Sequence, residues 1–168
     1  MEDNDLEKIE MSPIGFVRRT SPDEDVRDKT LFSEIVLVQD LARALDGIEG
    51  WSHVYVIYWL NRVPRPEEPI VHFPSRSKAS PPLGILATRA PIHPNPIGLT
   101  LVELIRREKN VLVVRGLDAY DGTPVLDIKP YPDWDQGQFI VVTDFRAPAW
   151  VKRIVKGCER FSGQCQRE

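Results

Sequence analysis

The chain has 168 residues, of which 42% are hydrophobic, so it is long enough for one domain with a proper core and too short for two ordinary domains. Its formal net charge is -3, residues 1–5 are acidic rather than a signal peptide, and no stretch approaches the roughly 20 apolar residues of a membrane span, so we expect a cytoplasmic protein without membrane contact. The cysteines Cys158 and Cys165 and the scattered histidines fit neither a zinc-ligand spacing nor a disulfide scaffold, so we expect no metal site.

Most of the predicted elements are strands. Residues 1–10 are mostly charged without periodicity and are expected to form a disordered tail. Runs of β-branched and other apolar residues then predict strands at 11–18, 34–38, 53–60, 83–88, 99–105, 111–117, 125–129 and 139–143. A short helix is predicted over 40–45, and polar residues 106–110 form the turn of a hairpin. Because the strands follow one another without the helices that a parallel sheet needs, we expect a mainly β fold, an antiparallel barrel that is closed or partly closed.

The last part of the chain has a different pattern. Residues 148–157 begin with a proline, carry apolar residues at helical spacing and stop at Gly157, which predicts a C-terminal helix. We therefore expect a barrel domain over 11–145, followed by this helix and a basic tail over 146–168. The basic residues of the tail form either a solvated helix face or an RNA contact.

A proline-rich loop over residues 89–100 is the most distinctive motif. Proline restricts the residue before it to the extended region, so Ala90, His93 and Asn95 are held out of the helical basin. A loop stiffened in this way loses less entropy when it binds a ligand, and it would present Arg89, His93 and Asn95. The alternative is a rigid turn with a purely structural purpose.

This loop belongs to a stretch that is free of acidic residues. Residues 69–102 contain no aspartate or glutamate, and the cations Arg76 and Lys78 lie among them. A local positive field indicates an anionic partner, such as a nucleic-acid backbone, a phosphate or a ligand carboxylate. We therefore take Arg76, Lys78 and His93 as candidate substrate-binding residues. His53, at the start of a buried-looking strand, is either a hydrogen-bonded core histidine or a further substrate contact.

A carboxylate and an ammonium group are predicted on one face of the strand 125–129. Side chains alternate along a strand, so Asp127 and Lys129 share one surface while Leu126 and Ile128 point into the core. Alone, the pair would be a solvent-side ion pair of little energetic value. The preceding Asp-Gly-Thr-Pro turn favours a binding site instead, because its backbone amides and hydroxyl can hold a ligand near these side chains.

Together these motifs resemble the TsaA-like (TrmO) family of S-adenosylmethionine-dependent tRNA methyltransferases. The resemblance rests on residues 89–101 and 121–131, with support from 50–54 and 14–16. It implies a β-barrel methyltransferase outside the Rossmann type, in agreement with the missing glycine fingerprint, and a homodimer that binds the cofactor near the subunit interface. The implied reaction is methyl transfer to N6 of threonylcarbamoyl-adenosine beside the tRNA anticodon, a base whose carboxylate suits an arginine-bearing surface.

The resemblance also implies roles for individual residues. Cofactor contacts fall at Asn61, Arg62, Arg89, Leu99, Asp121, Gly122, Thr123, Pro124 and Val125, with Arg27, Asp28 and Lys29 as further candidates. Around the acceptor nitrogen we place Asp127 as the base that takes up the proton, Lys129 to steady developing negative charge, Tyr131 and Asn95. The chain departs from the pattern at His93, where the family often has arginine, and we expect most of the C-terminal domain of bacterial members to be missing. Two other functions stay open: a non-catalytic module that binds S-adenosylmethionine or a nucleotide, and a methyltransferase for another nucleoside or a small molecule.

Overall fold

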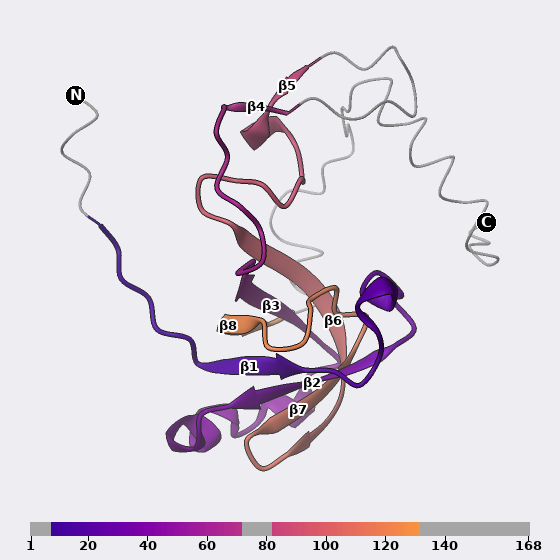
Figure 1. The fold of residues 1–168 in the computed structure, drawn as a ribbon. Helices are drawn as coiled ribbons and strands as arrows, with labels where there is room; N and C mark the ends of the chain where they lie inside the picture. The colour runs from indigo at the N-terminus through magenta and orange to yellow at the C-terminus, as the bar shows by residue number, and fades with distance from the viewer. Residues whose placement is uncertain (1–7, 72–81, 132–168) are drawn as a thin grey trace, which may run out of the picture.

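The computed structural model describes residues 8–71 and 82–131, and its centre is a closed antiparallel barrel (Figure 1). The barrel strands are β1 Gly15–Arg18, β2 Phe32–Leu37, β3 His53–Trp59, β6 Ile97–Glu108, β7 Val111–Arg115 and β8 Pro124–Pro130. They follow one another around the barrel in the order β1, β2, β7, β6, β3, β8, and β1 closes on β8 through the pair Gly15 and Val125. The expected mainly β barrel is therefore confirmed.

Short 3-10 segments and a small ribbon make up the rest of the described chain. The 3-10 segments are η1 Asp23–Asp25, η2 Gln39–Leu45, η3 Ile48–Gly50 and η4 Ile85–Ala87. The ribbon pairs β4 Ile70–Val71 with β5 Leu83–Gly84 on the connection between β3 and β6 (Figure 1). The helix predicted over 40–45 is the segment η2. The strand predicted at 139–143 and the C-terminal helix lie outside the described residues.

The strand predicted over 83–88 is wrong beyond Gly84. Its partner β4 is only two residues long, so the ladder cannot continue. The backbone N–H and the hydroxyl of Thr88 both donate to the carbonyl of Ile85, at 3.2 and 2.8 Å, and these bonds close a 3-10 turn in place of a strand.

The hairpin is longer than predicted at its turn. Strand β6 continues up to Glu108 and strand β7 starts at Val111, because charged residues of this hairpin are held by contacts to residues outside it. Arg107 donates to Asp46 and Glu49 at 2.9 and 3.1 Å. Only residues 109–110 remain as the turn, where Lys109 takes a φ of 56°.

The hydrophobic core fills the barrel interior. Strand β3 directs Val54, Val56 and Tyr58 inward, where they pack with buried aliphatic residues of the other strands such as Ile35 and Leu112. Each fully buried side chain of this kind contributes about 1.5–3 kcal/mol relative to exposure. His53 is half-buried on the outer side of β3, so it is not a core histidine.

Candidate functional site

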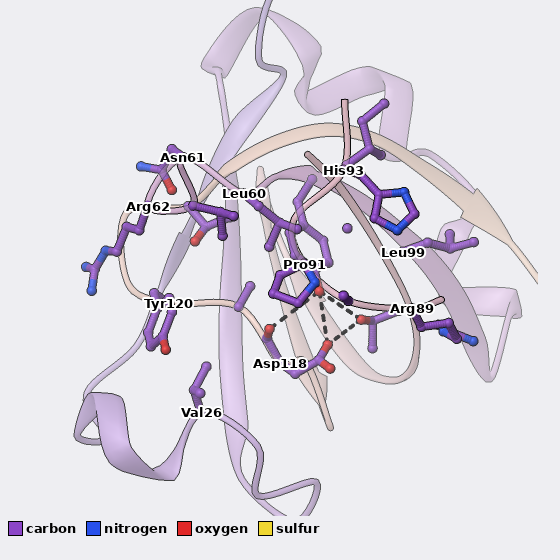
Figure 2. Close-up of a pocket in the computed structure, with 18 of the residues that line it drawn as sticks. Val26, Leu60, Asn61, Arg62, Arg89, Pro91, His93, Leu99, Asp118 and Tyr120 are labelled. Carbon is purple, nitrogen blue, oxygen red and sulfur yellow. Dashed lines mark hydrogen bonds between the residues drawn. The ribbon is translucent and has the colours of Figure 1, made fainter. Parts of the chain in front are cut away.

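A cavity of about 630 Å³ lies at one end of the barrel, where β3 ends, β6 begins and the connection from β7 to β8 crosses (Figure 2). Charged side chains around it come from the loop before β2, from the connection between β3 and β6, and from the connection between β7 and β8. Apolar residues such as Leu60 and Leu99 complete its wall. In Figure 2, Arg62 and Tyr120 lie on one side and Arg89 and His93 on the other, with Asp118 between them. The cavity therefore presents both charge signs around an apolar wall.

The floor of the cavity is a hydrogen-bonded group of three residues. The Tyr58 hydroxyl lies 3.1 Å from the Thr100 hydroxyl and donates to the Asp118 carboxylate at 3.0 Å. Thr100 donates to the same carboxylate oxygen. Gly98 makes this arrangement possible, because a Cβ at that position would overlap the Tyr58 ring.

The protonation states in this group are well defined. Burial raises the pKa of Tyr58 to about 12, so its hydroxyl keeps its proton near neutral pH. Burial works against the charge of Asp118, but the hydrogen bond from Thr100, the charge and hydrogen bond of Lys29 and the hydrogen bond from Tyr58 together hold the pKa of Asp118 below its usual value. The floor of the cavity therefore carries a fixed negative charge.

Two basic residues hold the loop that carries Asp118. Lys29 Nζ lies 3.2 Å from the second carboxylate oxygen of Asp118 and donates to the Gly116 carbonyl at 2.9 Å. The buried Arg19 guanidinium donates to the carbonyls on either side of Asp118, those of Leu117 at 2.9 Å and Ala119 at 3.4 Å. The position of Asp118 is therefore set by contacts distant in sequence.

The structure brings together half of the predicted cofactor contacts. These residues line the cavity: Arg27, Asn61, Arg62, Arg89, Leu99 and Thr123, and so does the predicted substrate residue His93. The Arg62 side chain already has hydrogen-bond partners at the rim, since it donates to Asp23 at 2.6 Å and to the Asp121 carbonyl at 3.0 Å. Its guanidinium carbon also lies 4.8 Å from the centre of the Tyr120 ring.

The other predicted cofactor contacts are not among the residues that line the cavity. These are Asp28, Lys29, Asp121, Gly122, Pro124 and Val125. The carboxylate of Asp121 accepts from the Arg19 backbone at 2.9 Å, Gly122 N–H donates to Val17 at 2.9 Å, and Val125 is fully buried in the core. The turn is thus anchored to Val17 and Arg19, and Lys29 is held by its ion pair with Asp118.

Three of the four predicted acceptor residues, Asp127, Lys129 and Tyr131, lie on the outer face of β3 and β8. Asp127 and Lys129 form an ion pair at 2.7 Å, and Tyr131 packs edge-on against Tyr55 with ring centroids 5.4 Å apart. The Tyr131 N–H donates to the carbonyl of His53 at 3.0 Å, so His53 lies beside the same group. The expectation that Asp127 and Lys129 share one surface is therefore met.

The outer face is separate from the cavity, although the two meet at Leu99. Strand register places Ile57 opposite Leu99 on one side and Asp127 on the other. With about 4.8 Å between neighbouring strands, Leu99 and Asp127 lie about 10 Å apart. Asn95 is exposed in the loop before β6 and is not part of the cavity lining, and Arg76 and Lys78 lie outside the described residues.

Sequence reasoning missed the three floor residues, Tyr58, Thr100 and Asp118. Residues 53–60 are apolar on both faces, which hides the alternation that places Tyr58 inward. The available signal was the alternation of Gly98 and Thr100 with exposed apolar residues in β6. Among the described residues, no cluster of histidine, cysteine and acidic side chains could hold a metal, and no helix is long and apolar enough to cross a membrane.

A closed antiparallel barrel with a cavity of mixed charge at one end defines a barrel domain with a candidate binding site, in a class apart from doubly wound nucleotide-binding folds. The chain belongs to the family described as tRNA-methyltransferase O N-terminal domain, whose model matches residues 17–136. The family predicted from the sequence is thereby confirmed.

Individual relatives agree with this assignment. A probable S-adenosyl-L-methionine-binding protein from Methanothermobacter thermautotrophicus is 42% identical over 133 residues, which cover 76% of this chain and 93% of that protein. A tRNA (adenine(37)-N6)-methyltransferase from Mus musculus is 35% identical over 129 residues, which are 70% of this chain but 28% of that protein. The crystal structure of TrmO from Pseudomonas aeruginosa superposes with a TM-score of 0.63 at 26% identity, covering 92% of this chain and 75% of that one.

Proposed function

We propose that the protein is an S-adenosylmethionine-dependent methyltransferase that methylates N6 of threonylcarbamoyl-adenosine beside the anticodon of tRNA. Family membership and the activities for which the relatives are named support the enzyme class and the cofactor. The observation that carries the proposal is the cavity at the barrel end, which combines a fixed carboxylate in its floor with arginines in its wall. This pattern matches a ligand that carries both a carboxylate and a cationic centre.

The residues of the cavity fit S-adenosylmethionine in size and chemistry. A volume of about 630 Å³ is within the usual range for small-molecule sites, about 300–1,000 Å³. Leu60 and Leu99 offer apolar surface for the adenine, and Arg89 offers a bidentate partner for the methionine carboxylate. The backbone of the Asn61 loop offers polar groups at the rim.

The cofactor supplies a methyl group activated on a sulfonium, so the protein must align the acceptor and remove one proton. Bound S-adenosylmethionine would supply this methyl group and would itself be released as the neutral thioether. Asp127 takes the proton from the acceptor nitrogen. Lys129, whose ammonium lies 2.7 Å from the Asp127 carboxylate, offsets negative charge on the acylated base.

The position of these groups supports a macromolecular acceptor. Asp127 and Lys129 have side-chain exposures of 44% and 64% and lie on the outer face of the barrel rather than inside the cavity. A base projecting from an RNA loop can reach such a face, and the nearby aromatic rings Tyr55 and Tyr131 give it a surface to stack on. A small-molecule acceptor would need an enclosed pocket instead.

Titration calorimetry with S-adenosylmethionine tests the cofactor site. Micromolar binding is expected for the intact protein, and Arg89→Ala is expected to weaken it at least about tenfold by removing a charge-assisted contact to the carboxylate. Arg106→Ala is the matched control, since Arg106 lies near the opposite end of β6 and pairs only with Glu108. Equal affinities for both variants would contradict the role of Arg89.

The exposed apolar residues of β6 also support the proposed homodimer. Ile97, Leu99 and Leu101 are 45%, 51% and 41% exposed in a row along β6, next to the cavity mouth. A second copy of the chain that covers this row would bury apolar surface beside the cofactor, as the family resemblance implies.

Leu101→Lys is expected to convert the dimer to a monomer at micromolar concentration, because it places an unpaired charge in the apolar row. Light scattering after size-exclusion chromatography measures the mass. Val38→Lys is the control, because Val38 is 43% exposed and follows β2 rather than lying in this row. A monomeric unmodified protein, or a dimer that survives Leu101→Lys, would contradict the proposed interface.

A non-catalytic S-adenosylmethionine-binding module is the second candidate. It is favoured by the separation of the cavity from Asp127, which is about 10 Å from Leu99 and already paired with Lys129. Transfer of labelled methyl groups into total RNA and into a small-metabolite pool separates the candidates. Label in tRNA supports the methyltransferase, label in metabolites supports a small-molecule acceptor, and binding without transfer supports the module.

A further inference from the structure

Asp118 differs in charge from every other ionisable residue that lines the cavity. Within the described parts of the chain, the charged lining residues besides Asp118 are the arginines Arg27, Arg62 and Arg89, together with the titratable His93. A cavity lined only by these cations would repel a cationic ligand centre. The one carboxylate therefore determines where in the cavity a positive charge is favourable.

The Asp118 carboxylate is also held in a fixed orientation. One oxygen accepts from the hydroxyls of Tyr58 and Thr100, and the other lies 3.2 Å from Lys29 Nζ. An ionised carboxylate has about four acceptor positions, so these three donors do not use all of them. Because the arrangement exists before any ligand binds, its electrostatic effect costs no reorganisation.

Arg89 and Asp118 act on the same region of the cavity. The charge of Arg89 lowers the pKa of Tyr58 while the charge of Asp118 raises it, so both side chains lie within electrostatic reach of that hydroxyl. A methionine moiety bound through its carboxylate to Arg89 has its sulfur only a short alkyl chain away. We take this sulfur to lie on the Asp118 side of the cavity, because both side chains line it.

We propose that Asp118 makes the cavity discriminate between the methyl donor and its demethylated product, by favouring the sulfonium over the neutral thioether. This inference rests on the proposed function, which supplies the ligand. S-adenosylmethionine and S-adenosylhomocysteine differ only in one methyl group and the positive charge on sulfur. Arginine contacts to the carboxylate hold both ligands equally, whereas a fixed negative charge beside the sulfur attracts only the donor and favours release of the product.

Lys29 works against this preference. Its ammonium partly neutralises Asp118, without being one of the lining residues. Removing the lysine charge leaves the carboxylate in place and makes the potential at the sulfur more negative. The two residues therefore predict opposite changes in the ratio of the two affinities.

Calorimetric titration of the whole chain with each ligand tests the proposal. Asp118→Asn is expected to lower the preference for S-adenosylmethionine over S-adenosylhomocysteine by about tenfold, with affinity for the thioether nearly unchanged. Lys29→Met is expected to raise the preference several-fold, and it keeps the test decisive if Asp118→Asn does not fold. Asp40→Asn, an equal charge change on the exposed segment η2, is expected to leave the ratio unchanged.

Each other outcome overturns a defined part of the argument. Equal loss of both ligands in Asp118→Asn would assign Asp118 to the ligand ammonium or ribose, which both ligands share, and would reject the proposal. An unchanged ratio in both Asp118→Asn and Lys29→Met would reject it as well. If the unmodified protein bound neither ligand, the proposed function itself would fail, and that result is distinct from a change in the ratio.

Discussion

Asp127→Asn is expected to reduce methyl transfer to tRNA by at least about 100-fold while leaving the affinity for S-adenosylmethionine nearly intact. Asparagine keeps the shape of the side chain but cannot take up the proton of the acceptor nitrogen, and a positioned general base contributes about 10²–10⁴-fold. The cofactor affinity is unaffected because Asp127 lies on the outer face, apart from the cavity lining. Single-turnover transfer of labelled methyl groups and calorimetric titration measure the two quantities separately.

Two variants separate the base from the ion pair. Lys129→Met breaks the same pair at 2.7 Å but keeps the carboxylate, so a smaller loss of transfer is expected. Glu34→Gln removes a carboxylate that pairs with Arg18 across β1 and β2, a pair that includes neither Asp127 nor Lys129, and transfer should be unchanged. Parallel losses of transfer and cofactor affinity in Asp127→Asn would instead show that the carboxylate supports the fold.

The local part of the architecture could be predicted from the sequence. Alternation within one strand fixes which side chains share a face, so the common surface of Asp127 and Lys129 follows from their spacing alone. The sequence likewise predicts a stiff loop before β6, because prolines restrict the backbone regardless of tertiary contacts. Its residues Arg89 and His93 do line the cavity.

The parts that could not be predicted depend on barrel closure. The partners of Asp118 are 18 and 60 residues away in sequence, at Thr100 and Tyr58, and only the strand order brings them together. The same closure separates Asp127 from the cavity, a distinction that spacing within β8 does not contain. Within the turn over residues 121–124, Thr123 lines the cavity, whereas the Asp121 carboxylate accepts from the Arg19 backbone, a contact between residues far apart in sequence that only the fold creates.

The second large effect is expected at Arg19, which connects the fold to the site. Its guanidinium is buried and donates to the Leu117 and Ala119 carbonyls, and its contacts to Ser21 and to the Asp25 carbonyl join a second loop to the same point. Removing the guanidinium leaves buried carbonyls without donors, which costs about 1–3 kcal/mol for each group.

Arg19→Met is therefore expected to lower the free energy of unfolding by about 3 kcal/mol and to weaken S-adenosylmethionine binding, because the loop that carries Asp118 loses its support. Urea unfolding and calorimetric titration measure the two effects. Arg18→Met is the matched control one residue earlier, where the side chain is 59% exposed and pairs with Glu34, and a change of at most about 1 kcal/mol is expected.

The two measurements also distinguish a positioning role from general stabilisation. If Arg19 only stabilised the barrel, the folded fraction of Arg19→Met would bind S-adenosylmethionine with unchanged affinity at temperatures far below unfolding. If it positions the Asp118 loop, the folded protein binds more weakly, and Arg19→Lys recovers only part of the affinity because one ammonium cannot reach all the carbonyls that the guanidinium holds. Equal stability losses in Arg18→Met and Arg19→Met would contradict both a stabilising and a positioning role of Arg19. Of these two arginines, Arg19 has buried partners, whereas Arg18 pairs with Glu34 at the surface.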